Sequence, residues 1–142
     1  MRETLPLLWR VRATASAVVI PPLVSHASFA RLAAWLGRDP AKPLAGPVDD
    51  AALASWVDRI LRSLGGPWRY TCLRRSAVLY HLLRRAGRPV ELWLGVRRDS
   101  AGALAAHAWL VRDGRPYLEP QPSHPASHTV IARFPEARAG AS

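Results

Sequence analysis

Cys72 is the only cysteine of the 142-residue chain, and it follows Thr71 at the start of a stretch with helical spacing. The start of a helix stabilises a thiolate, because the backbone N–H groups of the first turn are unpaired and the helix dipole is positive there. Arg74 and Arg75 add positive charge nearby. This placement is typical of a nucleophilic cysteine, although the residue alone is equally compatible with a buried, unreactive thiol.

A nucleophilic thiol needs a base within hydrogen-bond reach. Among the five histidines, His107 is the candidate, because it interrupts a predicted strand and is flanked by two alanines that leave room for another group. An unreactive strand histidine is the alternative. His81 lies too far along the helix from Cys72. His124 and His128 fall in a loop rich in proline and serine, where the intervening proline argues against a metal-binding helix, so we expect no metal site.

Glu119 is the candidate for the acid that orients this base. Asp113-Gly114 is a strong signal for a tight turn between two antiparallel strands. If the strands fold about this turn, facing residues have numbers that sum to about 227, which puts Glu119 near Ala108 and within reach of His107. A surface glutamate near a bend is the alternative, and spacing does not decide between the two.

The surrounding pattern predicts an α+β domain, with helices first and an antiparallel sheet after them. Residues 1–48 form a helical N-terminal extension, 49–120 the catalytic core and 121–142 a C-terminal tail of one domain over 1–142. The predicted helices span 7–20 (stopping at Pro21-Pro22), 25–37, about 50–64 and 72–86, and the predicted strands span 90–96, 105–111 and 115–120.

Charge and composition limit the partners. The net charge is +10, and all basic residues but Lys42 are arginine, so the surface attracts anions. No zinc finger, aromatic RNA-binding signature or helix-turn-helix accompanies the charge, and we expect no nucleic-acid partner. The apolar stretch 13–24 is short and carries two prolines, so we expect no membrane span. A lone cysteine excludes a disulfide framework, and with no recognisable secretion signal we expect the cytoplasm.

These residues together resemble the transglutaminase-like superfamily, whose core is a papain-like arrangement of a cysteine-headed helix packed on an antiparallel sheet. Within it the chain looks most like the leader peptidase of lasso-peptide biosynthesis, the protease half of the B protein. The resemblance covers roughly residues 50–120, and the motifs that carry it are Cys72-Leu73-Arg74-Arg75-Ser76, Arg84-Arg85-Ala86-Gly87, Leu94-Gly95-Val96, Ala106-His107-Ala108-Trp109 and Glu119. The third catalytic position is usually Asp in that family, whereas this chain has Glu119.

The resemblance implies a thiol protease of antibiotic-type peptide biosynthesis that removes the leader from a ribosomally made precursor. Cys72, His107 and Glu119 would be catalytic, with Trp68, Tyr70 and Trp109 as candidates for substrate binding or for packing. No cofactor is implied. The implied partners are the precursor peptide, a separate leader-binding protein and the macrolactam synthetase that closes the ring.

Two other functions stay open. The first is an amidase or acyltransferase of the same superfamily that uses the same three residues on another substrate. The second is a non-catalytic basic module that binds peptide or nucleic acid.

Overall fold

The computed structural model describes residues 5–26, 29–36, 48–66, 71–119 and 128–135, and the element order confirms the α+β class. The helices are α1 (Leu7–His26), α2 (Phe29–Leu36), α3 (Asp50–Ser63) and α4 (Cys72–Arg85). The strands are β1 (Glu91–Arg98), β2 (Leu104–Arg112), β3 (Arg115–Tyr117) and β4 (Thr129–Phe134), in the sheet order β3-β2-β1-β4. All neighbouring strands run antiparallel.

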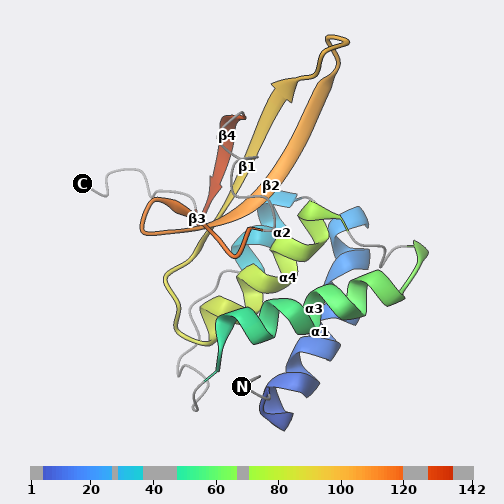
Figure 1. Ribbon diagram of the computed structural model, residues 1–142, viewed down its shortest axis with the longest axis vertical. Helices are drawn as coiled ribbons and strands as arrows, with labels where there is room; N and C mark the ends of the chain where they lie inside the picture. The colour runs from blue at the N-terminus through green and yellow to red at the C-terminus, as the bar shows by residue number, and fades with distance from the viewer. Residues whose placement is uncertain (1–4, 27–28, 37–47, 67–70, 120–127, 136–142) are drawn as a thin grey trace.

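Helix α4 is the centre of the packing. Figure 1 shows it between the sheet and the helices α1 and α3, with the β1–β2 hairpin projecting beyond the helices. Its residues from Ser76 to Tyr80, and Leu82 and Leu83, are buried. Gly87 follows the helix with a φ of +85°, a left-handed conformation that only glycine adopts without strain, and so confirms the predicted stop.

The first helix differs from the prediction. Pro21 and Pro22 were expected to end it, but α1 continues through both to His26. Each proline removes a helical hydrogen bond. Burial of Ile20 and Pro21 in the protein compensates for that loss, which the local pattern could not reveal. As a result, residues Leu7–Val24 belong to one continuous helix. By length and composition alone, this stretch is long and apolar enough to cross a membrane, and 28% of it is buried inside the protein.

The turn at Asp113-Gly114 has the predicted register. Both residues have positive φ, 54° and 75°, as a tight hairpin turn of this kind requires. The pairs Leu110–Tyr117 and Arg112–Arg115 have the partner numbers that the sequence predicted. However, β3 ends at Tyr117 and does not reach residue 120. Glu119 therefore lies just outside the ladder.

Strand β4 was not predicted. Residues 129–134 were assigned to the tail, yet they pair with β1 from Leu92 to Val96. The segment "TVIARF" has the β-branched and aromatic residues of a strand, but it is short and follows a proline-rich stretch. Its partner strand lies more than thirty residues away in sequence, so local pattern gave no indication of the pairing.

The two faces of the sheet differ. Ala108 and Leu110 of β2 and Leu92 of β1 belong to the hydrophobic core shared with the helices. Because side chains alternate along a strand, His107 and Trp109 point to the opposite side, here called the outer face of the sheet.

Candidate active site

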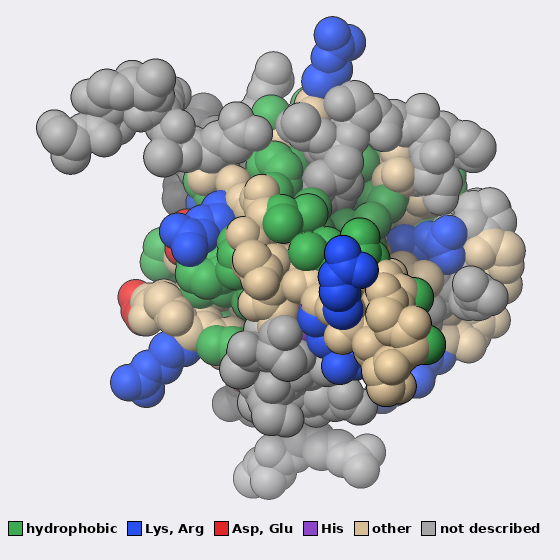
Figure 2. Space-filling view, turned by 90° about the horizontal axis from the view of Figure 1, so that it is seen from above, with side chains coloured by type: hydrophobic (Ala, Val, Ile, Leu, Met, Phe, Trp, Pro, Cys, Tyr) green, Lys and Arg blue, Asp and Glu red, His purple; other side chains and the backbone are tan. Residues whose placement is uncertain are grey.

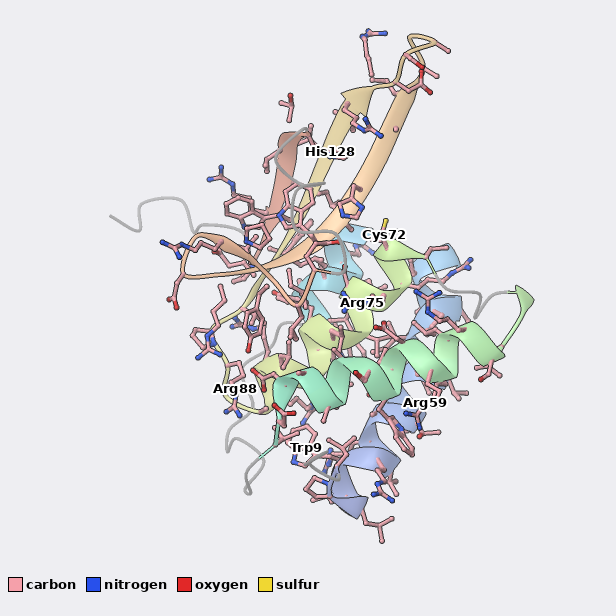
Figure 3. The ribbon with its side chains drawn as sticks, in the orientation of Figure 1. Trp9, Arg59, Cys72, Arg75, Arg88 and His128 are labelled. Atoms are coloured by element: carbon pink, nitrogen blue, oxygen red, sulfur yellow. The ribbon has the colours of Figure 1, made fainter. Side chains whose placement is uncertain are left out.

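Cys72 begins α4, as the sequence predicted. Thr71 caps the helix: its backbone is extended, and its side-chain oxygen accepts a hydrogen bond from the Arg74 backbone N–H at 3.1 Å. Cys72 is a half-buried free thiol. Figure 3 shows its sulfur directed away from α3, on the side of the molecule where His128 lies. The cap fixes the helix start, and with it the position of the thiol.

Ser76 joins this helix to the strand that carries His107. Its hydroxyl donates to the backbone carbonyl of Ala108 at 3.1 Å, and Ser76 is 1% exposed. In β2, the carbonyls of every second residue point toward β3. Those of Arg112 and Leu110 lie within the paired region, and the carbonyl of Ala108 is the first one beyond its end. The α4 hydroxyl therefore takes the place of the missing strand at the edge of β2.

This contact orients Cys72 relative to β2. Cys72 precedes Ser76 by four residues and so lies one turn away on the same helix face. β3 pairs with Leu110 to Arg112 of β2, and Figure 3 shows Cys72 at the end of α4 that lies nearer the β1–β2 hairpin.

His107 is 8% exposed and is held among aromatic rings on the outer face. Its imidazole stacks on Trp109, with ring centroids 5.6 Å apart and planes inclined by 16°. Trp93 packs edge-on against Trp109 at 6.3 Å. His128 completes the cluster, with its ring centroid 5.4 Å from that of His107. The ring of His128 also lies 6.1 Å from that of Trp109, so the three rings contact one another and together fix the orientation of the imidazole.

Glu119 meets His107. The carboxylate oxygen Oε1 lies 3.4 Å from Nε2 of His107, and the two side chains are only 7% and 9% exposed. This is an ion-pair distance when the imidazole is protonated. Burial of a carboxylate is unfavourable unless a partner compensates, and the imidazole of His107 is a polar group that lies beside Glu119.

The other residues considered for the site from the sequence lie elsewhere or, like Trp109, have a supporting role. Trp68, Tyr70 and His124 lie outside the described residues. Trp109 is 2% exposed, so it presents little surface to a substrate and instead supports the His107 ring. His81, excluded as a base, lies at the α2 interface, with Nδ1 3.2 Å from the Leu36 carbonyl oxygen.

His128 is the residue that sequence reasoning missed. It was assigned to a loop, but it precedes β4, and pairing of β4 with β1 brings it beside His107. Only the unpredicted strand could have indicated this. Within the described part of the chain, no group of three or more His, Cys, Asp or Glu side chains could hold a metal ion.

Arginine side chains are dispersed over the surface seen in Figure 2, with few acidic ones among them. The described arginines on this face do not gather into one stripe, as a groove that follows a nucleic-acid backbone would require.

Comparison with known proteins agrees with this architecture. No curated protein and no solved structure shows significant similarity to the chain. The family model described as the transglutaminase-like superfamily matches residues 16–133, which include all of the described site. That superfamily includes cysteine proteases and acyltransferases. With a cysteine-headed helix packed on a four-stranded antiparallel sheet, the chain belongs to the transglutaminase-like superfamily.

Proposed function

We propose that this protein is a cysteine endopeptidase that removes the leader peptide from a ribosomally synthesised lasso-peptide precursor. The observation that carries the proposal is the buried His107–Glu119 pair, 3.4 Å apart, in which His107 lies on β2, the strand whose edge receives the Cys72 helix. The order of the motifs along the chain resembles that of the lasso-peptide leader peptidase. This resemblance supports peptidase activity, and this class of substrate, within the superfamily.

The reaction follows from the roles of the three side chains. The Cys72 thiolate attacks the carbonyl carbon at the junction of leader and core, and the carbonyl oxygen becomes negatively charged. As the carbon–nitrogen bond breaks, His107 gives its proton to the departing amine of the core, which leaves the leader as a thioester on Cys72. Water, deprotonated by His107, then hydrolyses the thioester and restores the thiolate.

Glu119 determines which imidazole nitrogen takes part. Because Nε2 faces Glu119, Nδ1 is the nitrogen that exchanges its proton with Cys72 and the substrate. The carboxylate stabilises the imidazolium and holds the ring in this orientation. Glu is one methylene longer than the Asp usual at this position, and it performs the same function from its site beyond the end of β3.

The partners and compartment are part of the proposal. The substrate is the precursor peptide, presented by a separate leader-binding protein. The released core amine is the group that a separate ATP-using macrolactam synthetase would acylate. A reduced thiol is needed throughout, which fits the cytoplasm.

The test is mass spectrometry of a candidate precursor incubated with the protein and the leader-binding protein, in parallel with Cys72→Ala. We expect one cut by the native protein and none by the variant. A cut that persists in Cys72→Ala contradicts a cysteine mechanism. If the native protein transfers the acyl group to an added amine and releases no free acid, the acyltransferase function replaces this proposal. If precursor and partner bind but nothing is cut, the non-catalytic module is favoured.

A further inference from the structure

We propose that Arg75 is a positioning residue that holds Glu119 against His107, an inference that rests on the proposed function of this site. Arg75 lies on α4, three residues after Cys72, and is 5% exposed. Figure 3 shows it on the side of α4 that faces the interior of the molecule. A buried guanidinium is costly unless its N–H donors find acceptors, so the groups that accept hydrogen bonds from Arg75 indicate which segments it holds together.

Arg75 bridges two segments. Its Nε donates to Asp58 Oδ1 of α3 at 2.7 Å, and its Nη2 donates to the backbone carbonyl of Leu118 at 2.7 Å. The Asp58 carboxylate is itself only partly exposed and balances the buried charge. With Asp58 fixing the guanidinium plane, the second hydrogen bond has a defined direction and holds the residue immediately before Glu119.

Leu118 is the residue at which the chain leaves the sheet. Its φ is +56°, which a leucine adopts rarely and at a cost of about 1–3 kcal/mol. Such a conformation persists only where its surroundings impose it. The hydrogen bond from Arg75 to the Leu118 carbonyl is one contact that holds it, together with the packing of the Leu118 side chain against the core.

The strand register explains why this conformation matters. If β3 continued regularly beyond Tyr117, Glu119 would face Ala108, and directly opposed residues share one face of a sheet. Ala108 points into the hydrophobic core, so the carboxylate would point there too. The left-handed residue at 118 breaks the alternation, and Glu119 instead reaches His107 on the outer face.

The test is the titration of the His107 imidazole followed by NMR, with its resonance assigned from its loss in His107→Gln. In Glu119→Gln the midpoint falls, because the neighbouring carboxylate no longer stabilises the imidazolium. Arg75→Lys, which cannot hold both partners with the same planar fork, is expected to lower the midpoint toward that of Glu119→Gln. In the Glu119→Gln background, Arg75→Lys should cause no further fall. His128, the other titratable ring beside His107, is present in every variant.

Arg88 supplies a matched control. Its Nε pairs with Asp50 at 3.2 Å and its Nη2 donates to the Val48 carbonyl at 3.1 Å, the same kind of bridge on contacts that do not include Glu119. Arg88→Lys is expected to leave the His107 midpoint at its native value. A native midpoint in folded Arg75→Lys, or an equal fall in Arg88→Lys, overturns the inference.

Leu118 gives a second route should Arg75→Lys fail to fold. Leu118 packs partly against the core, so Leu118→Val keeps more apolar surface than Leu118→Asn. A β-branched residue tolerates positive φ poorly, whereas asparagine tolerates it well. We therefore expect the midpoint to fall in Leu118→Val and to be retained in Leu118→Asn. The reverse order, which loss of packing alone would give, contradicts the inference. None of these readouts requires a peptide substrate, so a shifted midpoint without any peptide cleavage would count against the proposed function and not against Arg75.

Discussion

Gly95 offers the sharpest test of how tightly the rings around His107 are packed. It lies on β1 directly opposite His107. A Cβ atom at this position would lie 2.8 Å from the His128 Cβ, and 2.8 and 2.9 Å from two carbons of the Trp109 ring. Ordinary contacts begin at about 3.4 Å, so Gly95→Ala must move its neighbours by roughly half an ångström or more.

Neither neighbour can yield easily. The Trp109 ring is buried between Trp93 and His107, and the His128 Cβ is attached directly to the backbone. Overpacking of this kind costs about 1–3 kcal/mol. With a urea dependence of about 1–3 kcal/mol per molar, the unfolding midpoint should fall by on the order of 1 M.

The assay is equilibrium unfolding in urea, followed by tryptophan fluorescence. Gly65→Ala is the matched control, because a Cβ atom added at Gly65 would meet nothing within 4 Å and this glycine has no positive φ. That substitution should change stability by less than about 0.5 kcal/mol. Since Trp109 supports the His107 ring, Gly95→Ala should also reduce Cys72 reactivity. Equal stability of Gly95→Ala and native protein would show that the ring cluster is looser than described.

Three further expectations concern single side chains. Thr71→Ala removes the α4 cap and should lower the unfolding free energy by about 1 kcal/mol in urea titrations; Thr71→Ser should retain it, and equal losses in both would argue against the cap. Burial lowers the pKa of His81 below its usual 6.5, so the unfolded chain binds a proton there more readily. The contribution of neutral His81 to the free energy of unfolding should thus be fully present above pH 6.5 and be lost as the pH drops below it. The free energy of unfolding should fall less with pH in His81→Gln, and identical pH profiles of the two proteins would refute this assignment. Burial, and then the hydrogen bond to Asp50, raise the pKa of Tyr117 above 10.0, so stability should fall as the pH rises through that value. Absorbance at 295 nm should show a late-titrating phenol that Tyr117→Phe lacks, and its persistence in that variant would contradict the prediction.

The parts of the fold that depend on local chemistry could be predicted from the sequence. The Asp113-Gly114 turn determines the register of β3 on β2, and Thr71 with Gly87 determines both ends of α4. The same turn register put Glu119 near Ala108 and within reach of His107; the two side chains do meet, but only because β3 ends at Tyr117 and the left-handed Leu118 turns Glu119 to the outer face.

The remaining features depend on contacts between distant segments. Burial keeps Pro21 inside α1, although its local preference ends a helix. Pairing of β4 with β1 brings His128 to the site, and no local pattern specifies a partner strand so far away. The sequence showed Arg75 only as positive charge near Cys72, because its contact with the Leu118 carbonyl depends on where the chain leaves β3.

The central claim is that His107 and Glu119 activate Cys72, and the most direct measurement is the rate of Cys72 alkylation by iodoacetamide at pH 6.5. Cys72 is the only cysteine, so the gain of one adduct in the mass spectrum reports this thiol alone. We predict that the native protein reacts fastest, Glu119→Gln more slowly and His107→Gln slowest, because each loss weakens the thiolate–imidazolium pair. A His107→Gln variant that is folded and alkylated at the native rate would contradict the account.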